Sequence, residues 1–151
     1  MNANNSFCGF ECVFEKKSDV WTFLKLFNIV LDDYYFSVVD ESVFSNRIRI
    51  EICKEFKVNY FEELIQKKFV SECLVLHLYP EGIQPEEINS YHDFLESTCE
   101  MIILLYDFVY LEIYCKNQIW LRNLMCEAIS ISGAVVEAKY ENTDTRTIMY
   151  V

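Results

Sequence analysis

Seven cysteines and two histidines are the side chains with which this chain could build a nucleophilic or metal site. A cysteine hydrolase needs a thiolate held by an imidazole, which a third group orients. The sequence offers two such pairs, Cys99 with His92 and Cys73 with His77. Neither pair comes with a glycine-rich elbow or an oxyanion loop. We therefore interpret His77 as a hydrogen-bonded strand residue and His92 as a surface residue, and the sequence carries no catalytic signature.

Metal and nucleotide binding would each need a closely spaced set of residues. Cys8 and Cys12 are four residues apart, but a structural zinc site takes four ligands, usually as two close pairs. The sequence has no second pair of that spacing, so we predict no metal and no cofactor, and we interpret both cysteines as packed strand residues. The three glycines, at positions 9, 82 and 133, cannot form a G-x-G-x-x-G motif or a P-loop.

Paired carboxylates are the remaining candidates for acid–base chemistry. They occur at Asp32-Asp33, Glu62-Glu63 and Glu86-Glu87. General acid–base catalysis depends on spacing in three dimensions, which adjacency in sequence does not report. Two of the pairs fall in predicted first or last turns of helices, where a solvated surface explains them. The sequence thus gives no positive indication of an enzyme.

Acidic residues are concentrated in one window of the chain. Residues 69–115 contain no lysine or arginine, and the formal net charge of the whole chain is −11. The carboxylates of the window are Glu72, Glu81, Glu86, Glu87, Asp93, Glu96, Glu100, Asp107 and Glu112. Nucleic acids and anionic membrane surfaces are bound through Lys and Arg. The charge therefore disfavours both of these partners and favours a basic protein.

Length and composition predict one folded domain over residues 1–151. The chain is 52% hydrophobic, with only 3 Gly and 2 Pro, which is the opposite of a disordered composition. The cysteine count is odd, most cysteines sit in apolar runs, and the first residues are polar. We therefore predict reduced thiols and a cytoplasmic location. The apolar runs are too short to span a bilayer.

Hydrophobic periodicity predicts alternating strands and helices. Strands are expected at residues 7–14, 34–39, 72–79, 101–106, 109–115, 135–140 and 147–151. Helices are expected from Ser18 to Asp32 or Asp33, over residues 60–69 and 90–98, and from Asn117 towards Gly133, with a helical first turn at Pro85. Because most neighbouring strands are joined by short turns, we predict an α+β fold: a largely antiparallel mixed sheet with helices mainly on one face.

Several local patterns sharpen this prediction. Residues 47–52 alternate, which favours a strand with Ile48, Ile50 and Ile52 on one face, although a loop within residues 40–58 is the open alternative. Asn59 and Asn117 are predicted helix caps, and Asp107-Phe108 suits a tight hairpin without the usual glycine.

The strand after that hairpin also alternates. Leu111 and Ile113 are expected to face inward, with Tyr110, Glu112 and Tyr114 facing outward as part of an interface. The alternative is that helices cover this face and the tyrosines pack beneath them.

Three segments resemble a family of small proteins from spore-forming Gram-positive bacteria that is catalogued only as a domain of unknown function. They are Ser90-Tyr-His-Asp-Phe-Leu-Glu-Ser-Thr-Cys-Glu100, the run from Leu104 to Gln118, and Tyr140-Glu-Asn-Thr-Asp-Thr-Arg-Thr147. The resemblance lies mainly in residues 90–147 and is weak in the first half. It implies a bacterial, cytoplasmic, single-domain protein, and it transfers no catalytic or ligand residue.

These observations favour a non-enzymatic binding protein whose acidic, tyrosine-bearing surface engages a basic protein, as an immunity or inhibitor protein does. The predicted partner-binding residues are Glu81, Glu86, Glu87, Tyr91, Asp93 and Glu96. The alternative is a small-molecule sensor or enzyme with His92, Cys99 and nearby carboxylates in a cleft. A third hypothesis is self-association, which at this net charge should use a surface away from the acidic one. The sequence leaves the oligomeric state open.

Overall fold

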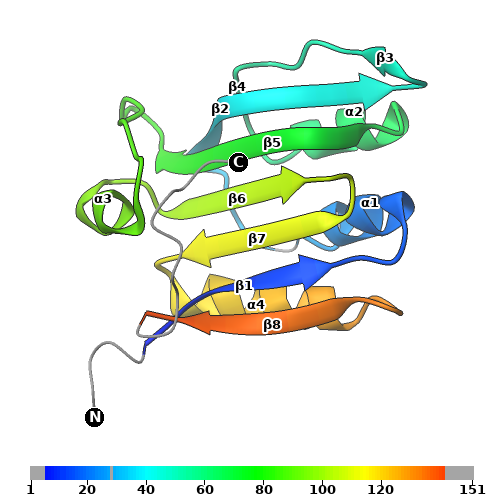
Figure 1. Cartoon of the computed structure of the whole chain (residues 1–151). Helices are drawn as coiled ribbons and strands as arrows, with labels where there is room; N and C mark the ends of the chain where they lie inside the picture. The colour runs from blue at the N-terminus through cyan, green and yellow to red at the C-terminus, as the bar shows by residue number, and fades with distance from the viewer. Residues whose placement is uncertain (1–5, 28, 142–151) are drawn as a thin grey trace.

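The computed structural model describes residues 6–27 and 29–141. Its strands are β1 Phe7–Val13, β2 Tyr34–Ser45, β3 Ile48–Arg49, β4 Glu55–Phe56, β5 Val70–Pro80, β6 Met101–Tyr106, β7 Tyr110–Cys115 and β8 Val135–Tyr140. Within the described residues each strand pair is antiparallel, and the strand order is β3-β2-β5-β6-β7-β1-β8, with β4 also paired to β2 (Figure 1). The helices are α1 Lys17–Lys25, α2 Tyr60–Gln66, α3 Tyr91–Glu96 and α4 Gln118–Ile129.

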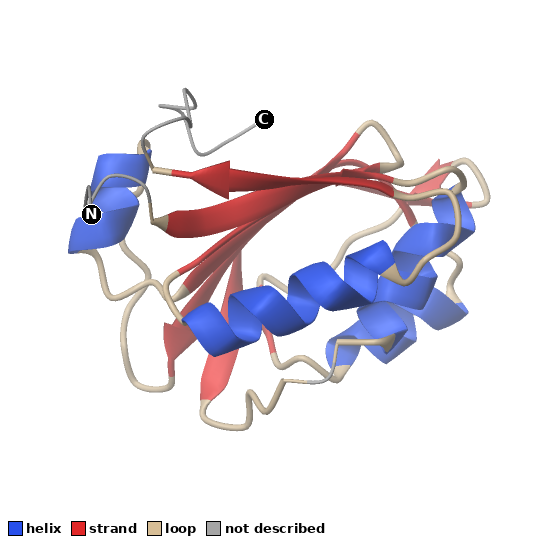
Figure 2. Cartoon of the chain, turned by 90° about the horizontal axis from the view of Figure 1, so that it is seen from below, coloured by secondary structure: helices blue, strands red, loops and turns tan. Residues whose placement is uncertain are grey.

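Three helices, α1, α2 and α4, lie against one face of the sheet, and α3 lies apart from them at one end (Figures 1 and 2). The main core forms between these helices and the sheet because alternate strand residues point towards the helices. Leu74, Leu76 and Leu78 of β5 contribute to it, as do Phe23 of α1 and Leu121 of α4. The predicted α+β fold, with an antiparallel sheet and helices mainly on one face, is confirmed.

A second, smaller core lies on the other face of the sheet. It contains Tyr79, Phe94 and Tyr114, with Tyr91 packed against it. The predicted alternation of β7 is confirmed. The expected exposure of its outward side is wrong, and the alternative, in which the tyrosines pack beneath a helix, holds: Glu112 is 3% exposed and Tyr114 is fully buried. Tyr114 packs against Tyr91 of α3, at 5.8 Å between ring centroids. Tyr110, at the start of β7, is exposed.

The β6–β7 turn is the predicted hairpin at Asp107 and Phe108. Their φ angles are positive, at +49° and +70°, and with Val109 they form the three-residue turn between the paired residues Tyr106 and Tyr110. Here a non-glycine pair adopts that geometry. The ammonium of Lys17 lies over the Phe108 ring, 4.9 Å from its centroid, and holds the turn against the start of α1.

Residues 40–58, for which the sequence left a strand and a loop open, contain both. Residues 40–45 continue β2, and the predicted strand over residues 47–52 is wrong except for the two residues of β3. Asn46 and Arg47 adopt positive φ and turn the chain back on β2, after which it leaves the sheet. Ile48 is 69% exposed, so the three isoleucines do not form one buried face.

Three helix predictions also need correction. The first helix ends at Lys25 rather than at Asp32 or Asp33. The segment that begins at Pro85 is an exposed loop rather than a helical turn. Asn59 precedes α2, but its side chain makes no capping hydrogen bond. The predicted strand at residues 147–151 lies outside the described residues.

Asn117 and Asn59 offer a matched test of helix capping. The Asn117 side chain accepts hydrogen bonds from the backbone N–H groups of Ile119 and Trp120, at 3.0 and 3.1 Å. We expect Asn117→Ala to lower the free energy of unfolding by about 1 kcal/mol. Asn59→Ala, which removes no such bond, should change it by less than about 0.5 kcal/mol in the same urea titrations. Equal losses for the two variants would contradict the capping role of Asn117.

Candidate functional site

The acidic residues predicted to bind a partner lie in the loop between β5 and α3 and on α3 itself. The loop over residues 81–87 is exposed throughout. Its first residue, Glu81, forms an ion pair with Lys57, and its backbone N–H donates to the carbonyl of Asp33 at 2.9 Å. Glu81 thus joins the β5–α3 loop to the segments on either side of β2.

Glu86 anchors this loop to the turn before β6. Its Oε2 accepts hydrogen bonds from the backbone N–H of Thr98, at 2.8 Å, and from the Thr98 hydroxyl. These bonds lower the pKa of the Glu86 carboxyl. The Tyr79 hydroxyl accepts from the Glu86 N–H and donates to the Glu86 carbonyl. The Glu86 carboxylate therefore has a structural partner already.

Of the remaining predicted carboxylates, Asp93 and Glu96 lie on α3 and Glu87 lies in the loop before it. Asp93 accepts a hydrogen bond from the backbone N–H of Asn89, at 3.1 Å, and Glu87 accepts one from the Asn89 amide, at 3.2 Å. Glu96 contacts the exposed His92 side chain at 3.2 Å. The five predicted carboxylates thus lie in the β5–α3 loop and on α3, at one end of the sheet (Figure 1), and all but Asp93 are exposed.

Tyr91 differs from the other predicted residues because its ring faces the sheet. The ring packs against Phe94 and Tyr114, and the hydroxyl donates to Oε1 of Glu141 at 3.0 Å. Burial, with the nearby Cys8 thiol and Glu141 carboxylate, raises the pKa of the Tyr91 hydroxyl. Tyr91 therefore connects α3 to the end of β8, and its ring is not available on the surface as a partner contact.

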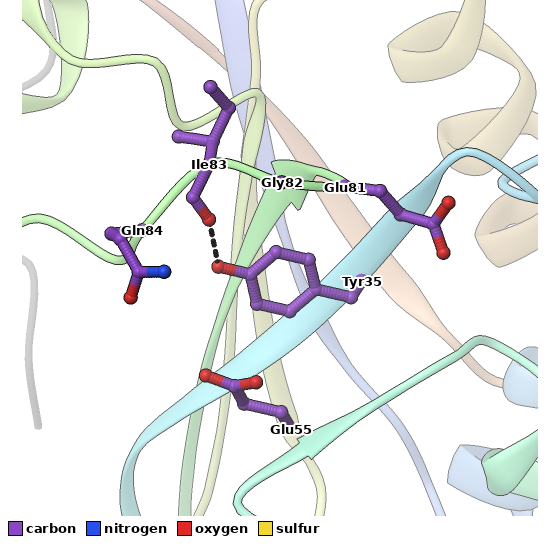
Figure 3. Close-up of a pocket in the computed structure, with 6 residues that line it drawn as sticks. All are labelled: Tyr35, Glu55, Glu81, Gly82, Ile83 and Gln84. Atoms are coloured by element: carbon purple, nitrogen blue, oxygen red, sulfur yellow. Dashed lines mark hydrogen bonds between the residues drawn. The ribbon is translucent and has the colours of Figure 1, made fainter.

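A solvent-open hollow of about 310 Å³ lies beside the acidic loop (Figure 3). It is lined by Tyr35, Glu55, Glu81, Gly82, Ile83 and Gln84. The Tyr35 hydroxyl donates to the Ile83 carbonyl at 2.5 Å, which fixes the ring at the base of the hollow. Figure 3 shows the Glu55 and Gln84 side chains directed towards Tyr35 and the Glu81 carboxylate directed away. Partial burial and the Glu55 carboxylate raise the pKa of Tyr35.

Tyr35 and Glu55 were not predicted as site residues. Glu55 reaches the hollow because β4 pairs with β2, which sets Glu55 opposite Ser37. Tyr35 stacks on Tyr79 of the neighbouring strand, at 5.9 Å between centroids. A two-residue strand has no periodicity to detect, so this pairing could not be predicted from the sequence.

The cleft expected under the alternative hypothesis is not assembled around His92 and Cys99. The His92 side chain is 76% exposed and contacts Glu96, whereas Cys99 is fully buried and its thiol donates to the Met101 carbonyl at 3.2 Å. Burial raises the pKa of Cys99 to about 12, so the thiol stays protonated at neutral pH.

The second cysteine–histidine pair is also unsuited to nucleophilic chemistry. Burial raises the pKa of Cys73 to about 11 and lowers that of His77 to about 4. The prediction that His77 is hydrogen-bonded is wrong for its Nε2 atom, which is buried without a hydrogen-bond partner. Within residues 6–27 and 29–141, no group of His, Cys, Asp and Glu side chains could hold a metal ion. In the same residues, no helix is long and apolar enough to cross a membrane.

Comparison with known proteins places the chain in a family without an assigned activity. Residues 10–150 match a family model described as "Protein of unknown function (DUF2691)", which confirms the resemblance and extends it over the first half. An uncharacterized protein of Bacillus subtilis (strain 168), YncE, is 29% identical over 90 residues, or 60% of this chain. The match spans 59% of that relative's length. No solved structure matches.

Proposed function

The chain belongs to the DUF2691 family of proteins of unknown function, and we propose that it is a binding protein whose acidic end engages a basic segment of another protein. The observation that carries the proposal is the hollow between Tyr35 and Glu55 beside the exposed acidic loop. The proposal places the protein in the bacterial cytoplasm, where thiols such as those of the exposed Cys53 and Cys126 remain reduced.

The hollow offers the groups that recognise a lysine or arginine side chain. The Glu55 carboxylate supplies the opposite charge, and the Tyr35 ring supplies an aromatic face for the cation. The Gln84 amide adds a polar group on the same side (Figure 3). At about 310 Å³ the hollow lies at the small end of ligand pockets, which suits one side chain of a partner.

The surrounding charge would steer such a partner to the hollow. Glu87 and Glu96 are exposed on the adjoining loop and helix, whereas the nearby Lys116 is directed inward, with its ammonium over the Phe94 ring and donating to the Ser97 carbonyl. With a net charge of −11, long-range attraction speeds the encounter with a cationic partner and weakens as salt rises.

A titration with a labelled basic peptide tests this proposal. The probe is a fluorescein-labelled decapeptide of alternating lysine and serine, followed by fluorescence anisotropy at low and at physiological salt. We expect Glu55→Gln to raise the dissociation constant about tenfold, because it removes the carboxylate that faces Tyr35. Reversing Glu87 and Glu96 to Lys should mainly slow association.

The matched control for this titration is Glu62→Gln. Glu62 is an exposed acidic residue on α2, which packs on the other face of the sheet, and the substitution removes the same charge. It should leave the dissociation constant within about twofold of the unmodified protein. Equal weakening by Glu55→Gln and Glu62→Gln would mean that the peptide responds to net charge alone, and the proposed site would be rejected.

A further inference from the structure

Strand β8 forms one edge of the sheet. Its six residues pair with β1, and no described strand pairs with its other side (Figure 1). The edge of a sheet presents backbone N–H and C=O groups that can pair with another strand. The opposite edge is different, because β2 there pairs with the short strands β3 and β4. Short edge strands limit pairing with other chains, so β8 is the edge suited to strand addition.

The charges along β8 indicate what kind of strand would fit. Glu137 lies directly opposite Glu11 of β1, and Glu11 lies directly opposite Glu112 of β7. Like charges directly opposite each other destabilise a sheet. The Lys139 ammonium lies 3.7 Å from the Glu11 carboxylate and reduces the repulsion within this row of three carboxylates. A cation on a strand added at the free side of β8, placed opposite Glu137, would reduce this repulsion further.

We propose that β8 pairs with β8 of a second copy of this chain, antiparallel and centred on Ala138. In that register the partner's Lys139 lies opposite Glu137, and Glu137 of the partner subunit lies opposite Lys139. The same surface is used twice, as a two-fold symmetric interface requires. Each β8 carries one acidic and one basic side chain, so the paired edges are neutral although each chain carries −11.

The helix-facing side of β8 supplies apolar surface for the same interface. Val136, Ala138 and Tyr140 share that side, since strand residues alternate. Ala138 and Tyr140 line a hollow of about 540 Å³ together with Met125 of α4. Pairing centred on Ala138 places the partner's Tyr140 opposite Val136, beside this hollow. The small side chain of Ala138 at the symmetry axis lets the two strands approach each other closely.

A charge-reversal series tests the register. Size-exclusion chromatography with light scattering should give twice the 18.0 kDa chain mass for the unmodified protein. Glu137→Lys should raise the dimer dissociation constant at least ~10-fold, because two attractive pairs become repulsive. The same change sets a lysine opposite Glu11 within the chain, so the fold is not weakened. Adding Lys139→Glu to Glu137→Lys should restore the dimer, and Glu51→Lys, in an exposed loop by the opposite edge, should leave it intact.

Cysteine cross-linking gives a second, geometric readout. Residues directly opposite in an antiparallel pair have Cα atoms close enough for a disulfide. With the exposed thiols removed by Cys53→Ser and Cys126→Ser, Ala138→Cys should link two chains on mild oxidation. Val136→Cys, whose opposite residue is the partner's Tyr140, should not. A monomer at all concentrations, a dimer that Glu137→Lys leaves unchanged, or equal linking by both cysteine variants would overturn the proposal.

Discussion

Gly9→Ala should lower the free energy of unfolding by roughly 3 kcal/mol, at the upper end of the range for overpacking. A Cβ atom at this position would lie 2.3 Å from the backbone oxygen of Ile113 and 3.1 Å from a ring carbon of Tyr114. The first neighbour belongs to the β1–β7 ladder and cannot rotate away. The methyl group would therefore push β1, and β8 with it, away from the rest of the sheet. Urea titrations followed by far-UV circular dichroism measure the loss.

Gly82→Asn is the control for this substitution. Gly82 has φ +83°, but a Cβ there meets nothing within 4 Å. Asparagine tolerates this left-handed conformation better than other residues, so the loss should stay below about 1 kcal/mol. If Gly9→Ala lowered the free energy of unfolding no more than Gly82→Asn, the close approach of β1 to β7 at Gly9 would be contradicted.

The parts of the fold that the sequence predicted well rest on local signals. Strand β7 shows strict alternation, and Asn117 stands directly before an apolar helical stripe. The segment around Ile48 carries an equally clear alternation, yet only two of its residues pair. The difference comes from Asn46 and Arg47, whose positive φ turns the chain. Asn46 is of a residue type that tolerates positive φ, but Arg47 is not, and a single asparagine does not mark a turn against so regular an alternation.

The second face of the sheet shows a limit of periodicity. Alternation tells which residues share a face, but not whether another element covers that face. Glu112 and Tyr114 were placed correctly relative to each other and wrongly relative to solvent. The packing of Tyr91 and Phe94 of α3 on this face is a tertiary contact, and no local pattern encodes it.

At the candidate site, too, local features could be predicted from the sequence and tertiary contacts could not. The end of β5 at Pro80 followed from composition, because proline and the nearby Gly82 interrupt a strand, but the helical turn predicted at Pro85 is an exposed loop. The partners of Glu86 and Tyr91, which are Thr98 and Glu141, come from other segments of the chain and could not be predicted. The hollow depends on Tyr35 and Glu55, which only the β2–β4 pairing brings together.

His77 is the buried titratable residue with the clearest consequence for stability. It lies in the middle of β5, between Ser37 of β2 and Ile102 of β6, on the face that carries the second core. Its side chain is 1% exposed, and Nε2 has no hydrogen-bond partner. Burial disfavours the charged imidazolium and lowers the pKa of His77 from 6.5 to about 4. The folded protein therefore holds this ring neutral at pH values where the unfolded chain protonates it.

The protein should consequently lose stability as the pH falls from 6.5 towards 4. In this interval His77 is protonated in the unfolded state but stays neutral in the folded state. The free energy of unfolding therefore decreases, by about 3 kcal/mol in total. His77→Leu should abolish this component and preserve stability at pH 7, since it also removes an unpaired buried polar atom. His92→Gln, at the exposed histidine, should keep the original pH profile. Urea titrations across this range decide the matter: parallel profiles for the unmodified protein and His77→Leu would show that protonation of His77 is not opposed by folding.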